Sequence, residues 1–72
     1  MELLKIEQHE RLRREEVASR LRHLADMLES HNDIEFERNG VQFTVHVPDT
    51  VRLKLELELE ADEREFEIEL KW

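Results

Sequence analysis

A strict alternation of apolar and charged residues near the end of the chain constrains its fold more than any other feature. Every second position of residues 51–60 is apolar, and every position between them carries a charge. In a helix these apolar side chains would be scattered around the whole circumference, whereas in a β-strand they share one face. Leu and Glu intrinsically favour helices, so the period overrides propensity here. Residues 66–72 repeat the alternation after a loop at 61–64, and both segments are predicted to be strands.

Another pair of alternating segments, residues 34–37 and 41–47, is separated by Asn39-Gly40. Asn-Gly between alternating segments is the strongest short hairpin signal, because both turn residues take a positive φ. A two-residue loop also determines the register, and it brings apolar residues of one face together. The predicted partners are Arg38 with Val41, Phe36 with Phe43, and Ile34 with Val45.

Residues 14–30 have a helical period instead. Glu15 and Glu16 would lie in the first turn, where carboxylates interact favourably with the helix dipole. The pattern stops at Ser30, where a polar segment begins. One amphipathic helix is therefore expected. Its apolar stripe consists of Val17, Leu21, Leu24 and Leu28.

The remaining segments complete an expected order of strand, helix and four further strands. Residues 3–8 alternate briefly, with Leu4 and Ile6 on one side, and predict a short first strand. Pro48-Asp49 is expected to form the turn before residue 51. The expected fold is α+β: a twisted antiparallel sheet of about five strands with the helix packed on its apolar face, in a single domain spanning residues 1–72. Pattern alone does not decide where the first strand joins this sheet.

The final 22 residues, VRLKLELELEADEREFEIELKW, end on Lys71-Trp72 and follow the helical segment REEVASRLRHLADMLES. Together these segments resemble the amphi-Trp domain family, which is named for such an amphipathic stretch followed by Trp. The resemblance covers essentially the whole chain. It implies a small prokaryotic protein or module with this α+β outline. The resemblance carries no established activity and no catalytic residues.

The net charge of −8 is concentrated in the predicted strand region. Residues 1–30 hold six basic and seven acidic residues, a net of −1, whereas residues 31–72 hold five and twelve, a net of −7. An acidic surface disfavours contact with nucleic-acid phosphates and with anionic lipid. Neither a nucleic acid nor a membrane is therefore expected as a partner, whereas a cationic protein is a possible one.

If the last two strands pair, their glutamates occupy neighbouring positions on one face, where opposed like charges destabilise a sheet. Basic residues, bound cations or a basic partner would offset this repulsion. The arginines of the helix region suggest that the helix of one molecule could meet the glutamates of another. Trp72 shares the parity of Leu70, so it is expected to close the rim of the core or to anchor a partner. The candidate interaction surface is Glu56, Glu58, Glu67, Glu69, Trp72, Arg13 and Arg20.

The sequence shows none of the residue arrangements that catalytic and metal sites require. The chain has no Cys, which excludes a disulfide, a thiolate metal site and a cysteine nucleophile. No Gly-rich elbow surrounds any Ser or Thr. No enzymatic activity, cofactor or specific metal site is therefore expected. The histidines lack ligand spacing and are expected on the surface: His9, His23, His31 and His46.

No apolar segment approaches the ~18 residues of a membrane span. The first residues also lack the pattern of a signal peptide, so the expected location is the cytoplasm. Small domains without disulfides bury a limited share of their surface, and self-association would stabilise this one. A homodimer is expected, formed through a sheet edge or the rim around Trp72. The expected function is a non-catalytic interaction or structural module that binds protein or itself; the alternative is binding of cations or small ligands by the acidic sheet face.

Overall fold

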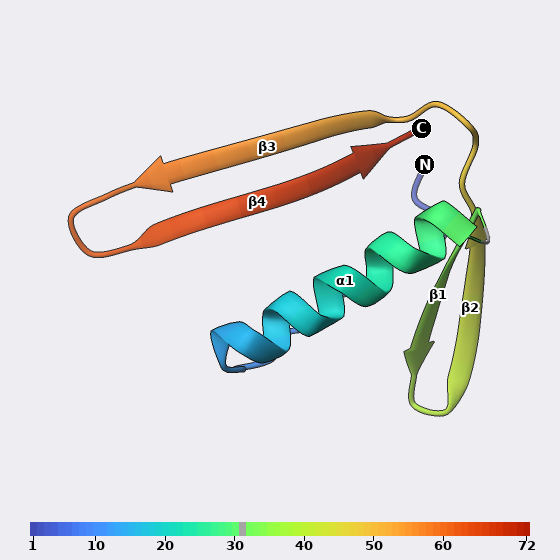
Figure 1. The fold of residues 1–72 in the computed structure, drawn as a ribbon, viewed down its shortest axis with the longest axis horizontal. Coiled ribbons are helices and arrows are strands. Elements are labelled where there is room, and N and C mark those ends of the chain that lie inside the picture. The colour runs from blue at the N-terminus through green and yellow to red at the C-terminus, as the bar shows by residue number, and fades with distance from the viewer. Residues whose placement is uncertain (31) are drawn as a thin grey trace.

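The computed structural model describes residues 1–30 and 32–72 of the chain. His31, one of the histidines expected on the surface, lies outside the described residues. The α+β class, with one helix and antiparallel strands, is confirmed (Figure 1). The elements are α1 (Arg14–Ser30), β1 (Asp33–Arg38), β2 (Val41–His46), β3 (Arg52–Leu59) and β4 (Arg64–Lys71).

α1 begins directly after Arg13, whose carbonyl oxygen accepts hydrogen bonds from the backbone N–H groups of Glu16 and Val17, at 3.0 and 3.1 Å. The helix contacts β1, and Leu24 on its apolar stripe is half-buried. Val17 and Leu21 on the same stripe stay 43% and 44% exposed. The predicted helix is therefore confirmed, but only part of its apolar stripe is covered.

β1 and β2 form the predicted hairpin around Asn39 and Gly40. Both turn residues have a positive φ, 52° and 77°, as a two-residue turn of this kind requires. The predicted register is confirmed, with the partners Arg38–Val41, Phe36–Phe43 and Ile34–Val45.

β3 and β4 form a second antiparallel hairpin, as predicted for the last two strands. Each strand has eight residues, which corresponds to a length of about 26 Å. The alternation places apolar residues on one face and most of the charges on the other. The apolar partners are Leu53–Leu70, Leu55–Ile68 and Leu57–Phe66.

The prediction of one sheet of about five strands is wrong. The strands form two separate two-stranded sheets, and the helix contacts β1 of the first sheet and neither β3 nor β4. The backbone N–H of Val47 donates to the carbonyl oxygen of Asn32 at 2.8 Å, and Pro48 has no N–H to continue a ladder. Backbone pairing with β2 therefore stops before β3 begins. Residues 47–51 then carry the chain away from the β1–β2 hairpin to the start of β3 (Figure 1).

Helix width explains why one helix could not cover all strands. An α-helix with its side chains is about 10 Å across, and neighbouring strands lie about 4.8 Å apart. One helix therefore covers about two strands.

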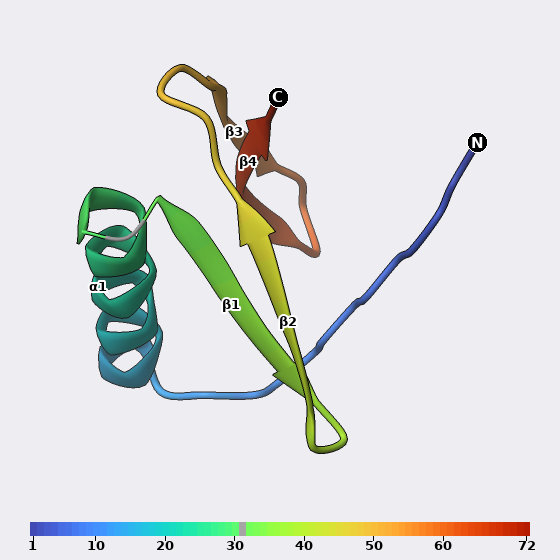
Figure 2. The same cartoon turned by 90° about the vertical axis from the view of Figure 1, so that its right-hand side faces the viewer.

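The predicted first strand at residues 3–8 is also wrong, since this segment forms neither helix nor strand. The carbonyl oxygen of Glu7 accepts a hydrogen bond from the Arg38 guanidinium instead of from a neighbouring strand. Lys5 forms an ion pair with the Glu7 carboxylate at 2.8 Å. Figure 2 shows the segment before α1 as an extended chain that ends far from the helix. Six alternating residues form a strand only where a neighbouring strand offers backbone groups to which they can hydrogen-bond.

Among the described residues, Val47 is the only buried hydrophobic residue, at 6% exposed. The accessible surface is 7151 Å², whereas a compact monomer of this mass exposes about 4,800 Å². The radius of gyration is 14.2 Å, against about 11 Å for a compact chain of this length. A single copy therefore leaves most of its apolar residues in contact with water.

Candidate functional site

The most unusual surface of this chain is the apolar side of the β3–β4 hairpin, which we call the leucine face. Its leucines on β3 are each 60% to 68% exposed, and Phe66 and Ile68 on β4 are 62% and 48% exposed. A typical monomer rarely exposes contiguous apolar patches larger than a few hundred Å². The leucine face consists of Leu53, Leu55, Leu57, Leu59, Phe66, Ile68 and Leu70.

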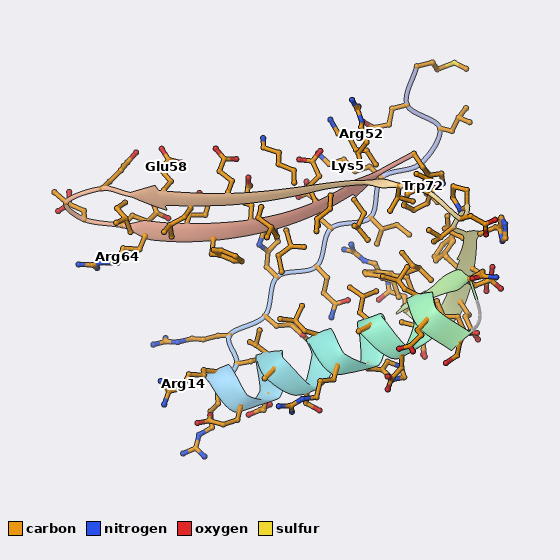
Figure 3. All side chains as sticks on the ribbon, turned by 45° about the horizontal axis from the view of Figure 1, so that its top comes forward. Lys5, Arg14, Arg52, Glu58, Arg64 and Trp72 are labelled. Atoms are coloured by element: carbon orange, nitrogen blue, oxygen red, sulfur yellow. The ribbon has the colours of Figure 1, made fainter. Side chains whose placement is uncertain are left out.

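Different side chains occupy the two ends of the leucine face. At the hairpin tip, Arg64 is the cross-strand partner of Leu59 and is therefore on this face. At the other end, Trp72 follows β4 and is 56% exposed. Trp72 lines a shallow depression of about 530 Å³ together with Val51 and Leu70. Figure 3 shows Arg64 and Glu58 on opposite sides of the hairpin, with Glu58 turned away from α1.

The opposite side of the hairpin carries opposed acidic residues. Glu56 faces Glu67, and Glu58 faces Glu65, as direct cross-strand partners. Like charges in these positions repel each other. We call this surface the glutamate face, made of Glu56, Glu58, Glu65, Glu67 and Glu69.

Lysines offset part of this repulsion. Lys54 lies 3.3 Å from the Glu56 carboxylate and is the cross-strand partner of Glu69. Lys71 lies 3.1 Å from the Glu69 carboxylate. Hydrogen bonding to Lys71, and then its charge, lowers the pKa of Glu69, whereas hydrogen bonding to Glu56 raises the pKa of Lys54. At the end of the hairpin opposite its tip, lysine charges therefore offset the charges of the neighbouring carboxylates.

Glu67 is in the opposite situation. Its pKa is raised, first because its protonated form can hydrogen-bond to Glu56 and then because Glu65 is a neighbouring negative charge. A carboxyl group whose pKa is raised by folding stabilises the hairpin at pH values below the ordinary pKa of Glu. This contribution is lost as the pH rises through the raised pKa. At neutral pH, Glu67 therefore weakens the β3–β4 pairing.

Replacing Glu67 by Gln is expected to raise the melting temperature at about pH 7 and to have little effect at about pH 3, because Gln keeps a donor for Glu56 without the charge. Glu69→Gln is the matched control on the same strand and face. It removes a carboxylate whose pKa is lowered, so it is expected to reduce the melting temperature at about pH 7. Circular dichroism melts at both pH values measure this, and shifts in the same direction for both variants would contradict it.

The predicted interaction residues do not form one surface. Glu56 and Glu67 are brought together, with Glu58 and Glu69 along the same face, whereas Trp72 lines the depression beside Leu70, at the end of the leucine face. Arg20 forms an ion pair with the Glu10 carboxylate, and Arg13 is exposed just before α1. Since α1 does not contact β3 or β4, one chain does not bring these arginines to the glutamates.

The residues that sequence reasoning missed as a site are those of the leucine face, which it assigned to the core. The helix predicted from residues 14–30 has one apolar stripe, too narrow for the apolar face of about five strands. Comparing these widths would have predicted that part of the apolar surface has no cover within one copy.

Histidines pair with acids on the surface: His46 Nδ1 lies 3.3 Å from Asp33, and His9 lies 3.7 Å from Glu7. Across residues 1–30 and 32–72, no three His, Asp or Glu side chains form a group that could hold a metal ion. Within the same residues, no helix has both the length and the apolar character needed to cross a membrane.

The chain was compared with curated proteins, with solved structures and with models of protein families. No curated protein and no solved structure matches the chain significantly. The family model of the Amphi-Trp domain matches residues 1–72, which is the whole chain. The resemblance in the sequence rests on three features together: the amphipathic β3–β4 hairpin, the terminal Lys71-Trp72 and the helix α1 before them. The chain therefore belongs to the Amphi-Trp domain family.

Proposed function

We propose that this chain is a non-catalytic interaction module whose binding surface is the leucine face, with Trp72 at one end. One observation carries the proposal: every leucine of β3 is at least 60% exposed. Large exposed apolar patches mark interaction sites. An isolated two-stranded hairpin is marginally stable in water, so this hairpin needs a cover of some kind.

The same apolar contacts would stabilise the hairpin and bind the partner. Burying a Leu side chain fully contributes roughly 1.5–3 kcal/mol, and the leucine face offers several. The glutamate face would remain in water and keep the hairpin soluble. The module would therefore bind on one side only, through a surface without acidic residues.

Affinity capture from a native extract tests this function. The tagged chain is compared with Leu57→Lys, which puts a charge on the leucine face, and with Glu58→Lys, its neighbour on the opposite face. Leu57→Lys is expected to lose the captured proteins, including untagged copies of the chain, because a charge buried without a partner is strongly unfavourable. Glu58→Lys is expected to retain them. An identical set of proteins for Leu57→Lys and the parent chain would contradict the proposal.

Weak cation binding between opposed carboxylates of the glutamate face is a second candidate, supported by the pairs Glu56–Glu67 and Glu58–Glu65, each of which offers two carboxylates and not a metal site of three ligands. A cation there would relieve the repulsion between these carboxylates. Titration with Ca²⁺ or Mg²⁺ at constant ionic strength should then raise the melting temperature. No increase beyond that given by a monovalent salt would contradict this candidate.

A further inference from the structure

The uncovered surface of one copy is large enough for a stable dimer. The chain exposes 7151 Å², which exceeds the surface of a compact monomer by about 2,400 Å². A standard interface removes about 800 Å² from each partner. This excess also includes the extended segment before α1, and an interface of standard size on the leucine face would cover about one third of it.

The chemistry of the leucine face selects an apolar occupant. Between its two ends the face has no charged residue, so a polar partner would lose hydration without gaining hydrogen bonds. Sheets stack face to face at about 10 Å through such surfaces. A second copy of the chain brings a face of matching length and composition.

Charge distinguishes face stacking from edge pairing. If β4 paired with β4 of another copy, the two glutamate faces would form one continuous acidic surface, with more opposed carboxylates. In face-to-face stacking, both glutamate faces point outward into water. Stacking therefore avoids the repulsion that edge pairing would add.

The ends of the leucine face determine the direction of stacking. Ile68 lies midway along the chain between Arg64 and Trp72. Arg64 and Ile68 are on the leucine face, and Trp72 lines the depression beside Leu70 at its end. Parallel stacking would place Arg64 of one copy against Arg64 of the other. Antiparallel stacking, with a two-fold axis near Ile68, would place each Arg64 over Trp72 of the second copy. Trp is the best aromatic partner for a cation, and the described structure shows no ion pair for Arg64.

We infer that the leucine face is covered by the leucine face of a second copy, in an antiparallel two-fold dimer with Arg64 of each copy stacked on Trp72 of the other. This inference rests on the proposed function and names its partner. The dimer is isologous, since the same surface of both copies is buried.

The inference is tested with the purified full chain, by sedimentation equilibrium over a dilution series. The expected mass at high concentration is about 17.6 kDa, twice 8.8 kDa. Trp72 is the only Trp, so its emission reports directly on this contact. Its emission is expected to shift to the red on dilution, with the same midpoint as the mass. A mass that stays at 8.8 kDa at high concentration would overturn the inference.

Arg64→Gln is expected to weaken the dimer by about tenfold, because two symmetric cation–π contacts are lost. The control Arg22→Gln makes the same change on α1, which does not contact β3 or β4, and should leave the dissociation constant within about twofold. Equal effects of the two variants would overturn the antiparallel arrangement. In a mixture of ¹³C-labelled and unlabelled chains, nuclear Overhauser effects between copies should connect the Leu55 and Ile68 methyl groups. Contacts between copies found only at α1 or a strand edge would also overturn it.

The two experiments distinguish a failure of the dimer inference from a failure of the proposed function. If the purified chain stays monomeric while Leu57→Lys still loses its captured partners, the leucine face binds another protein and the second-copy inference fails alone. If Leu57→Lys keeps all partners and the purified chain is also monomeric, the proposed function fails as well.

Discussion

Replacing Leu55 and Leu57 together by Ala is expected to abolish the dimer at every accessible concentration. In one copy these side chains are 60% and 65% exposed, so most of their burial happens only when the face is covered. Truncating a buried Leu costs about 2 kcal/mol at the low end of measured values. A dimer contains four such truncations, about 8 kcal/mol together, which equals the whole binding free energy of a dimer with a Kd of about 1 μM.

Thermal unfolding over a range of protein concentrations measures this effect. The melting temperature of the parent chain is expected to rise with concentration, because association stabilises the folded state. The double variant is expected to melt at one concentration-independent, lower temperature. The matched control is Lys54→Ala with Glu56→Ala, two changes on the same strand but on the glutamate face. A concentration dependence unchanged in the leucine variant would contradict the prediction.

Replacing Val47 by Asp is expected to unfold the part of the chain built from α1, β1 and β2. Val47 is 6% exposed, and its backbone N–H holds Asn32 at the start of β1. The substitution removes roughly 1.5–3 kcal/mol of apolar burial and adds several kcal/mol for a buried carboxylate without a cation. The loss is comparable with the whole stability of a domain of this size.

Far-ultraviolet circular dichroism at 222 nm follows the loss of α1 in this variant. Val41→Asp is the control, because the same residue type on β2 is 54% exposed and an added carboxylate there stays in water. The control is expected to keep the helical signal. Equal signals from both variants would show that Val47 does not hold α1 and β1 together.

Local features of this chain were predictable from its sequence. The helix at Arg14–Ser30, the Asn39-Gly40 turn with its register, and the pairing of the last two strands all follow from patterns within a few residues. Turn residues and the side-chain period depend on residues close together in the sequence, so both can be predicted before any tertiary contact is known. The opposed glutamates of the β3–β4 hairpin followed from the same reasoning.

Long-range features were not predictable in the same way. Residues 3–8 alternate like a strand, yet no sheet edge accepts their backbone, and a side chain from β1 bonds Glu7 instead. The division into two sheets depends on how the link 47–51 directs the chain after Val47. No local pattern encodes that direction.

The sequence by itself determined which residues share a face, because a two-residue period assigns every side chain of a strand to one of two sides. It therefore separated the leucine face from the glutamate face without reference to any contact. Only the tertiary structure decided what covers each face. α1 packs on β1 and is too narrow to reach the second hairpin, so residues that the pattern assigned to a core lie exposed on β3 and β4. A side chain is buried only where a second surface covers it, and within one copy α1 does not cover the leucine face.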